Sequence, residues 1–271
     1  MGSVKSRTEV IVIFQIHFLN QGRVDAILLS YNGEHIFIDS GFRKNGLNSI
    51  KYMKQFGITK LKYYIGNHAH RNHIGGAAPI IAQFDPEEIL IPHDRVRERI
   101  IKYASKKEKP IVKSAKYRIL TPKSEPIQWG DLTINCIGPL KVKKYLPWIT
   151  AENYNSLILR IDRGDRHMVL LTGDTSGSIL SQIEKNLPGS IRAEVLKNAH
   201  HNAALAASLL KKIKPQIVAI CNNKLVSKTY RKRIKNVGAD YYHACKKGSG
   251  NFLLEDTGDG WVFRKPKEVL P

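Results

Sequence analysis

The chain has 271 residues, and its 44 lysines and arginines outnumber its 23 aspartates and glutamates, for a formal net charge of +21. Apolar residues make up 42% of it, which is enough for a sizeable core and excludes disorder by composition. The excess positive charge favours a polyanionic partner over a neutral or cationic one. No apolar run approaches the roughly 18 residues of a membrane span. Three scattered cysteines without a CxxC indicate a reducing compartment. We therefore expect a soluble cytoplasmic protein without membrane insertion.

The first part of the chain alternates predicted strands and helices. Asn32-Gly33 is typical of a tight hairpin turn between two strands. Apolar residues at three-residue spacing after Gly46 predict a helix. The predicted strands are Val10–His17, Asp25–Ser30, His35–Ile38 and Leu61–Ile65, and the predicted helices are Gly46–Gly57, Ile74–Phe84 and Arg95–Lys107.

The second half repeats this alternation after a basic, irregular stretch at residues 106–123, which we interpret as an insert. The predicted strands are Ser156–Ile161, His167–Leu171, Ala193–Leu196, Ile217–Cys221, Phe252–Leu254 and Trp261–Phe263, and the predicted helices are Ser178–Lys185, Ala203–Lys212 and Lys228–Asn236. Hairpins followed by helices in each half fit an α/β fold in which two sheets pack face to face with helices outside. We therefore predict one domain over residues 1–271 with a four-layer αββα sandwich.

Three histidines fall within six residues at a predicted strand-to-helix turn. His68 and His70 alternate, so their side chains point to the same side of an extended chain, and His73 enters at the first helical turn. Gly75 and Gly76 allow close backbone packing behind them. Imidazoles grouped in this way predict a metal-binding cluster, and the alternative is a patch of surface histidines.

Other candidate ligands also follow predicted strands. Asp39 and Asp174 each end an apolar strand, where a carboxylate can equally be a helix N-cap. His200 and His201 follow another strand exit. Because several strand ends each deliver an aspartate or a histidine, we expect them to share one site at one edge of a sheet.

These motifs together resemble a known fold family. His68–Gly76 is similar to the HxHxDHxGG signature of the metallo-β-lactamase fold. Ile38–Gly41 and Leu171–Asp174 resemble its two aspartate motifs. The resemblance implies an αββα hydrolase with a metal centre.

Further segments resemble one group within that fold, the ComEC-like hydrolase domains of competence proteins that act in DNA uptake. Asn153–Leu159 and Leu196–His201 carry this similarity. Gln21-Gly22 and Asp25-Ala26 echo the QGDA start of the group with two residues inserted. The resemblance therefore implies a nuclease.

The resemblance also implies roles for individual residues. His68 and His70 would bind a first metal, and His73 and His200 a second, with Asp174 bridging. His201 is an alternative to His200, and Asn155, where most of the superfamily has a third histidine, is another possible ligand. Asp39 would orient a ligand from behind. The implied catalytic residues are Asp39, Asp174 and His70.

Asn72 departs from the family pattern, which has a metal-binding aspartate there. An amide offers a neutral oxygen but no charge, so affinity for the second metal should fall. Three interpretations follow: one tight and one weak ion, a mononuclear enzyme, or a degraded site. Histidine and carboxylate ligands suit one or two divalent ions, with zinc or manganese expected.

A metal-activated water can hydrolyse a phosphodiester, an ester or a lactam. The charge favours the phosphodiester, because clustered Lys and Arg residues neutralise phosphates and interleaved tyrosines such as Tyr230 could stack on bases. We therefore predict a metal-dependent nuclease with DNA as its partner. The alternatives are a hydrolase of a small anionic ester, lactone or phosphoester, and a nucleic-acid-binding protein with a weakened metal site. The predicted nucleic-acid-binding residues are Lys211, Lys212, Lys228, Arg231, Lys232, Arg233 and Lys235.

Overall fold

The computed structural model describes residues 13–142, 150–201, 203–222, 224–245 and 248–270. The first three residues of the predicted strand Val10–His17 lie outside this part of the chain.

The first half and the C-terminus build one eight-stranded sheet, in the order β15-β14-β1-β2-β3-β4-β5-β6. Strands β1 to β3 pair antiparallel, and β3 to β6 run parallel. The two-residue turn between β2 and β3 has positive φ at Asn32 and Gly33, as the sequence predicts for a hairpin. The strands are β1 (Phe14–Phe18), β2 (Ile27–Tyr31), β3 (Glu34–Ile38), β4 (Tyr63–Ile65), β5 (Glu88–Ile91), β6 (Tyr117–Ile119), β14 (Phe252–Asp256) and β15 (Trp261–Arg264).

The second half builds a seven-stranded sheet, in the order β13-β12-β11-β10-β9-β8-β7. Its β10 to β13 strands run parallel, and β7 to β10 pair antiparallel. The strands are β7 (Ile127–Trp129), β8 (Leu132–Gly138), β9 (Ile158–Arg163), β10 (Arg166–Leu171), β11 (Val195–Lys197), β12 (Ile217–Ile220) and β13 (Asp240–His243).

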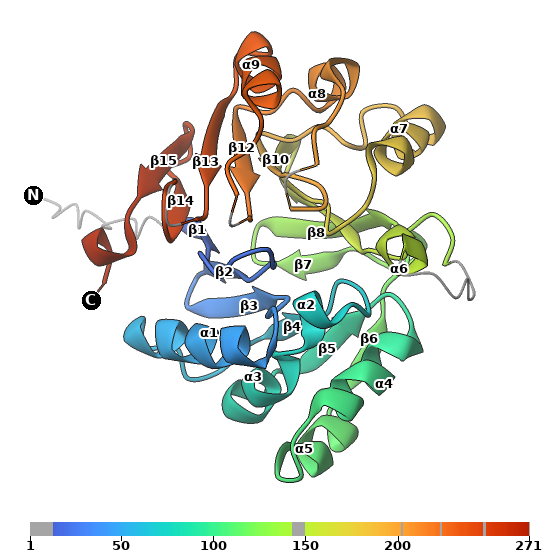
Figure 1. The fold of residues 1–271 in the computed structure, drawn as a ribbon, viewed down its shortest axis with the longest axis vertical. Coiled ribbons are helices and arrows are strands. Elements are labelled where there is room, and N and C mark those ends of the chain that lie inside the picture. Colours follow the sequence, from blue (N-terminus) through green and yellow to red (C-terminus); the bar gives the residue numbers. More distant parts are fainter. Residues whose placement is uncertain (1–12, 143–149, 202, 223, 246–247, 271) are drawn as a thin grey trace, which may run out of the picture.

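Helices cover the outer face of each sheet (Figure 1). Helices α1, α3, α4 and α5 lie on the first sheet, and α7, α8 and α9 on the second. The helices are α1 (Arg43–Gln55), α2 (Arg71–Ile74), α3 (Ala77–Phe84), α4 (Asp94–Tyr103), α5 (Glu108–Ser114), α6 (Thr150–Tyr154), α7 (Gly177–Asn186), α8 (Ala207–Ile213) and α9 (Lys228–Asn236), followed by a 3₁₀ turn at Pro266–Glu268.

Strand residues alternate between two apolar environments, as the two-residue period of a strand requires. In β2, Ile27 and Leu29 join the core between the two sheets, whereas Leu28 packs under the first helix layer. In β12, Ile217 and Ala219 face the central core and Val218 packs under α8 and α9. Three buried apolar layers separate four layers of secondary structure, which confirms the predicted αββα sandwich.

The basic stretch 106–123 is regular structure in its central part. It contains α5, whose Val112 is buried under the first sheet, and β6, which pairs parallel with β5 at the sheet edge. The sequence patterns predicted α9 with its observed bounds and missed the short strands β5, β6, β7 and β13 and the seven-residue strand β8.

The parallel strands bring the predicted site residues to one place. Asp39 follows β3, His68 follows β4, Asp174 follows β10, and His200-His201 follow β11. Close backbone packing supports the histidine turn, since a side-chain carbon built at Gly76 would lie 2.8 Å from the Gly46 backbone. No described helix combines the length and the apolar character needed to cross a bilayer.

Candidate metal centre

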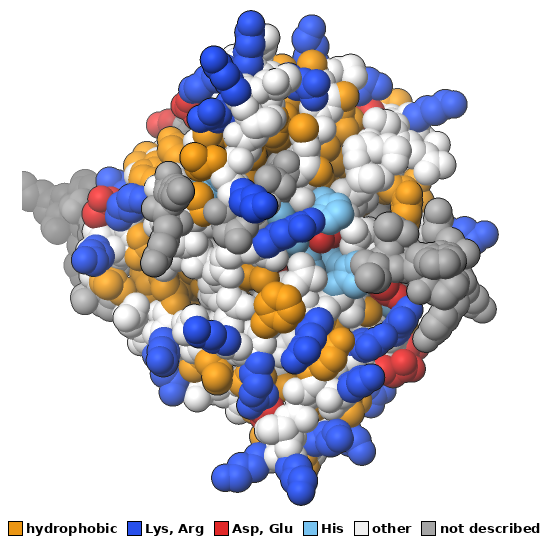
Figure 2. Space-filling view, viewed as in Figure 1, with side chains coloured by type: hydrophobic (Ala, Val, Ile, Leu, Met, Phe, Trp, Pro, Cys, Tyr) orange, Lys and Arg blue, Asp and Glu red, His pale blue; other side chains and the backbone are white. Residues whose placement is uncertain are grey.

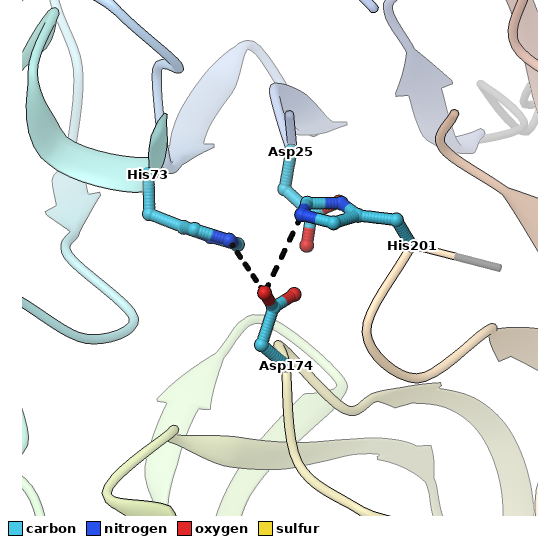
Figure 3. A group of neighbouring side chains, drawn as sticks. All are labelled: Asp25, His73, Asp174 and His201. Carbon is cyan, nitrogen blue, oxygen red and sulfur yellow. Dashed lines mark ion pairs between the residues drawn. The ribbon is translucent and has the colours of Figure 1, made fainter. Parts of the chain in front are cut away.

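Four buried side chains converge between the two sheets: Asp25, His73, Asp174 and His201 (Figure 3). Each offers a ligand atom, and these atoms all lie within 4.8 Å of one another. They come from the loop before β2, from α2, and from the loops after β10 and β11. Groups far apart in the sequence thus form one cluster of nitrogen and oxygen donors, which is the donor chemistry of a divalent metal site.

Asp174 is the common partner in this cluster. Its Oδ2 lies 3.2 Å from His73 Nε2 and 3.4 Å from His201 Nε2. Its Oδ1 is buried and has no hydrogen-bond partner among the described residues. Burial alone would raise the pKa of Asp174, but the neighbouring His73 and His201 hold it well below its usual range. The carboxylate is therefore ionised and has one oxygen free for a cation.

The carboxylate of Asp39 holds His73 from behind. His73 Nδ1–H donates to Asp39 Oδ2 at 2.6 Å, and Asp39 Oδ1 accepts the backbone N–H of Asn67 at 2.9 Å. Burial works against the charged form of His73, but Asp174 and Asp39 outweigh it and hold the pKa of His73 well above its usual range. The raised pKa favours the protonated form of His73, and a metal that bound at Nε2 would compete with this proton.

His68 and His70 form a second group of donors beside the first. Asn67 Nδ2 donates to Leu157 O at 2.7 Å, so its Oδ1 faces His68 Nδ1 at 3.1 Å and places the proton there. His68 Nε2 then carries a lone pair and lies 2.9 Å from His70 Nδ1. Burial, together with nearby His73, lowers the pKa of His68 well below its usual range. Two ring nitrogens that face each other in this way can be joined by one cation.

His201, rather than His200, is the buried histidine of the cluster. The His201 side chain is 1% exposed, and its Nδ1 lies 3.4 Å from Asp25 Oδ1, which leaves Nε2 for a ligand. The His200 side chain is 38% exposed, with Nε2 3.8 Å from Asp174 Oδ2. Position directly after the strand favoured His200 in the sequence. The left-handed backbone at both residues instead turns His201 inward.

Asn72 lies beside the cluster, with Nδ2 3.2 Å from His201 Nε2. Its amide thus donates to a ring nitrogen that could otherwise bind a metal. Asn155 is buried in the loop before β9, and the next residue, Ser156, accepts the backbone N–H of Asp174 at 3.1 Å. This hydrogen bond from the segment before β9 fixes the backbone of Asp174.

Sequence reasoning did not assign Asp25 to the site. Its only signal was the Gln21–Ala26 segment, in which two inserted residues obscure the QGDA pattern. Asp25 Oδ2 also forms an ion pair with the buried Lys197, which the sequence did not single out either.

The donor set fits a metal of the kind the fold family implies. His68, His73 and His201 each have Nδ1 beside an oxygen acceptor and present Nε2 to the interior. Asp174 supplies a buried oxygen that has no hydrogen-bond partner among the described residues. A histidine that binds a metal through one ring nitrogen usually has its other ring nitrogen beside an acceptor.

Some basic side chains lie close to this site, and others lie farther along the surface. Figure 2 shows pale-blue histidines near the middle of one face, with Lys and Arg side chains beside them and more at both ends of the molecule. Arg23 influences His200 electrostatically, and Arg71 directly follows His70; both side chains are exposed. The predicted lysines and arginines on α8 and α9 lie farther along the surface, and five of them are exposed: Lys211, Lys212, Lys228, Lys232 and Lys235.

The predicted base-stacking role of Tyr230 is wrong. Its side chain is 1% exposed, and its hydroxyl donates to Asn198 Oδ1 at 2.5 Å. Tyr230 is the apolar anchor that attaches α9 to the second sheet. Arg231 and Arg233 of this helix are half-buried, and Arg233 Nη1 donates to Leu205 O at 3.4 Å.

A cavity of about 360 Å³ opens beside His200. Its lining includes Leu205, Leu209 and the serines at the start of α7. It also includes Thr175, the residue after Asp174, so the cavity adjoins the loop that carries this carboxylate.

Comparison with known proteins identifies the fold. No protein-family model matches the chain, and no curated protein matches it in sequence. Solved structures do. The metallo-beta-lactamase fold protein YhfI from Bacillus subtilis has 18% identity and a TM-score of 0.59 over 90% of this chain and 100% of its own. Igni18, a metallo hydrolase from Ignicoccus hospitalis, has 15% identity and a TM-score of 0.57 over 89% and 98%.

A diphosphatase from the PhnP family is also similar, with 12% identity and a TM-score of 0.52 over 91% of this chain and 98% of its own. The chain therefore has the metallo-β-lactamase fold, with a candidate metal site at the shared edge of its two sheets.

Proposed function

We propose that this protein is a metal-dependent hydrolase of phosphodiesters and that DNA is its substrate. One observation carries the proposal: imidazoles from both halves of the chain converge on Asp174 Oδ2, while Asp174 Oδ1 has no hydrogen-bond partner in the part of the chain that the structure describes. Such a centre has no evident structural purpose, because its buried polar atoms cost stability unless a cation completes them.

The residues of the cluster have different roles in the proposed hydrolysis. His68, His70, His73, His201 and Asp174 would hold one or two divalent ions, which lower the pKa of bound water and supply hydroxide at neutral pH. Asp39 fixes the ring of His73 and keeps its Nε2 directed at Asp174. Asp25 has the same place behind His201. Asn72 carries no charge, so it contributes less to ion binding than the aspartate of the family would.

Exposed cations close to the site support a phosphate substrate. Neither Arg23 nor Arg71 forms an ion pair within the described part of the chain, and Arg71 lies over the Tyr103 ring at 5.6 Å. Guanidinium groups pair well with phosphate oxygens. The more distant lysines of α8 and α9 would extend contact along a polymer, and the ComEC-like segments point in the same direction.

The test compares DNA with a small chromogenic phosphodiester in one buffer. Metal-depleted protein should be inactive, Mn²⁺ or Zn²⁺ should restore cleavage, and Asp174→Ala should abolish it. Asp240→Ala is the matched control, because this exposed carboxylate forms an ion pair with Lys235 at the surface. Metal-loaded protein that cleaves neither substrate would refute the proposal.

The cavity beside His200 favours a second candidate, hydrolysis of a small anionic phosphoester. Its size suits a compact leaving group, and the similar PhnP-family structure is described as a diphosphatase. Faster cleavage of small phosphoesters than of DNA in the same panel would select this candidate. Asn72 supports a third, a nucleic-acid-binding protein with a weakened centre, for which DNA binding would survive chelation.

A further inference from the structure

Lys197 is a buried cation directly behind the candidate metal centre. Its side chain is 1% exposed, and its Nζ forms an ion pair with Asp25 Oδ2 and donates to Gly173 O at 3.0 Å. Burial opposes its charge, but Asp25 and Asp174 outweigh burial and raise the pKa of Lys197 above its ordinary value. With a carboxylate and a carbonyl oxygen as its partners, the Lys197 ammonium places a positive charge beside a cluster of metal-binding groups.

The ammonium distinguishes two otherwise similar pairs. In each pair a buried aspartate stands behind a histidine whose Nε2 faces Asp174, and the two rings stack at 5.2 Å. Asp39 is held by a neutral backbone N–H and lies 2.6 Å from His73. Asp25 is held by the Lys197 ammonium and lies 3.4 Å from His201. Asp25 therefore passes little of its negative charge to its histidine.

Two features, Lys197 and Asn72, weaken metal binding on the His201 side of the centre. Lys197 cancels the Asp25 charge, and Asn72 replaces an anionic ligand with an amide that donates to His201 Nε2. On the other side, His68 and His70 have a short nitrogen-to-nitrogen contact with Asp174 nearby. Like charges repel strongly in a poorly solvated interior, so a cation behind His201 opposes a second one in front of it.

We propose that Lys197 sets the charge of the His201 side of the centre, so that this side binds its ion weakly and exchanges it readily. This inference rests on the metal-binding part of the proposed function. Lys197 acts through Asp25 and His201 and is a positioning residue.

Titration of metal-depleted protein with Mn²⁺ alone, followed by calorimetry and electron paramagnetic resonance, tests this inference without measuring activity. Wild-type protein should bind a first ion tightly and a second at least about tenfold more weakly. Lys197→Met should strengthen the second ion by about tenfold or more and leave the first within about threefold. Asp25→Asn, which keeps the ammonium, should weaken the second ion. General damage to the site would weaken ion binding in both variants. The inference is therefore supported only if Lys197→Met strengthens second-ion binding and Asp25→Asn weakens it.

An unchanged second-ion affinity in Lys197→Met, with the first ion still bound, would overturn this inference and leave the proposed function intact. Absence of any bound ion in wild-type protein would overturn both. If Lys197→Met does not fold, the Asp25→Asn/Lys197→Met double variant buries no unpaired charge. Its second-ion affinity should stay within about threefold of wild type, and a larger change in either direction would contradict charge cancellation.

Discussion

The Asp39–His73 and Asp25–His201 pairs contain the same chemical groups but differ in the charge of the group that anchors each aspartate. Both orient an imidazole toward Asp174. The first is anchored by the Asn67 backbone, which adds no net charge, and the second by Lys197, which does. Orientation by a peptide N–H leaves the carboxylate's charge available to the metal, whereas an ammonium offsets that charge. An aspartate behind a metal-binding histidine therefore strengthens metal binding less when a buried cation is its partner.

Removing each carboxylate in turn tests this comparison with the largest expected effect. Asp39→Asn should weaken metal binding by about 10- to 100-fold, because asparagine is uncharged and has one acceptor oxygen for the two N–H groups that Asp39 accepts. Asparagine suits the left-handed backbone at this position, so the fold should survive. Asp25→Asn should cost less, since its histidine lies 3.4 Å away. Affinities measured by competition with a chelating dye decide this, and equal losses would break the distinction.

Acidification should weaken metal binding because protons compete with the metal for His73 of the Asp39–His73 pair. The pKa of His73 is raised, so its proton stabilises the metal-free protein at low pH, and that contribution is lost as pH rises through the raised value. A metal must displace this proton. Apparent affinity should therefore rise about tenfold per pH unit until His73 is deprotonated. Titrations across this range measure the slope, and a pH-independent affinity would contradict the protonated state of His73.

An aspartate in place of Asn72 should strengthen metal binding on the His201 side of the centre. Asn72→Asp replaces an amide that donates to His201 Nε2 with an anionic ligand, and second-ion affinity should rise about tenfold. Hydrolysis should increase as well if two ions act together. Asn236→Asp, at the exposed end of α9, controls for the added charge. No change in either quantity would mean that residue 72 does not face the metal.

The smallest effect is expected at the mouth of the site. Arg23→Ala should raise KM for a phosphodiester by a few-fold with kcat nearly unchanged, because an exposed guanidinium contributes up to about 1 kcal/mol. Arg192→Ala is the matched control, being an exposed arginine outside the site. Steady-state kinetics at low salt provide the measurement. A fall in kcat alone would place Arg23 in a role other than substrate binding.

The sequence predicted those parts of the site that are local in the chain. His68, His70 and His73 share one turn, so their alternation and the glycines behind them were sufficient. The αββα layering also followed from the order of elements. The choice between His200 and His201 did not, since it depends on the left-handed backbone at both residues. Asp25 and Lys197 meet only through tertiary packing, and neither lies in a pattern that indicates the other.

Short and surface elements were hard to predict for a related reason. Strands β6 and β7 have three residues each, too few to show a clear period. Tyr230 looked like an exposed aromatic among lysines, but the helical period turns it inward onto Asn198. The sequence predicted helix α9, but the packing of α9 against the second sheet determined which of its faces is buried.

The account's central claim is that the cluster around Asp174 is a hydrolytic metal centre. The most direct test titrates metal-depleted protein with Mn²⁺ or Zn²⁺ while hydrolysis of a chromogenic phosphodiester is recorded. The account predicts that hydrolysis rises with bound metal, saturates at one to two equivalents and is absent from Asp174→Ala. Tight, stoichiometric metal binding without hydrolysis of the phosphodiester or of DNA would contradict it.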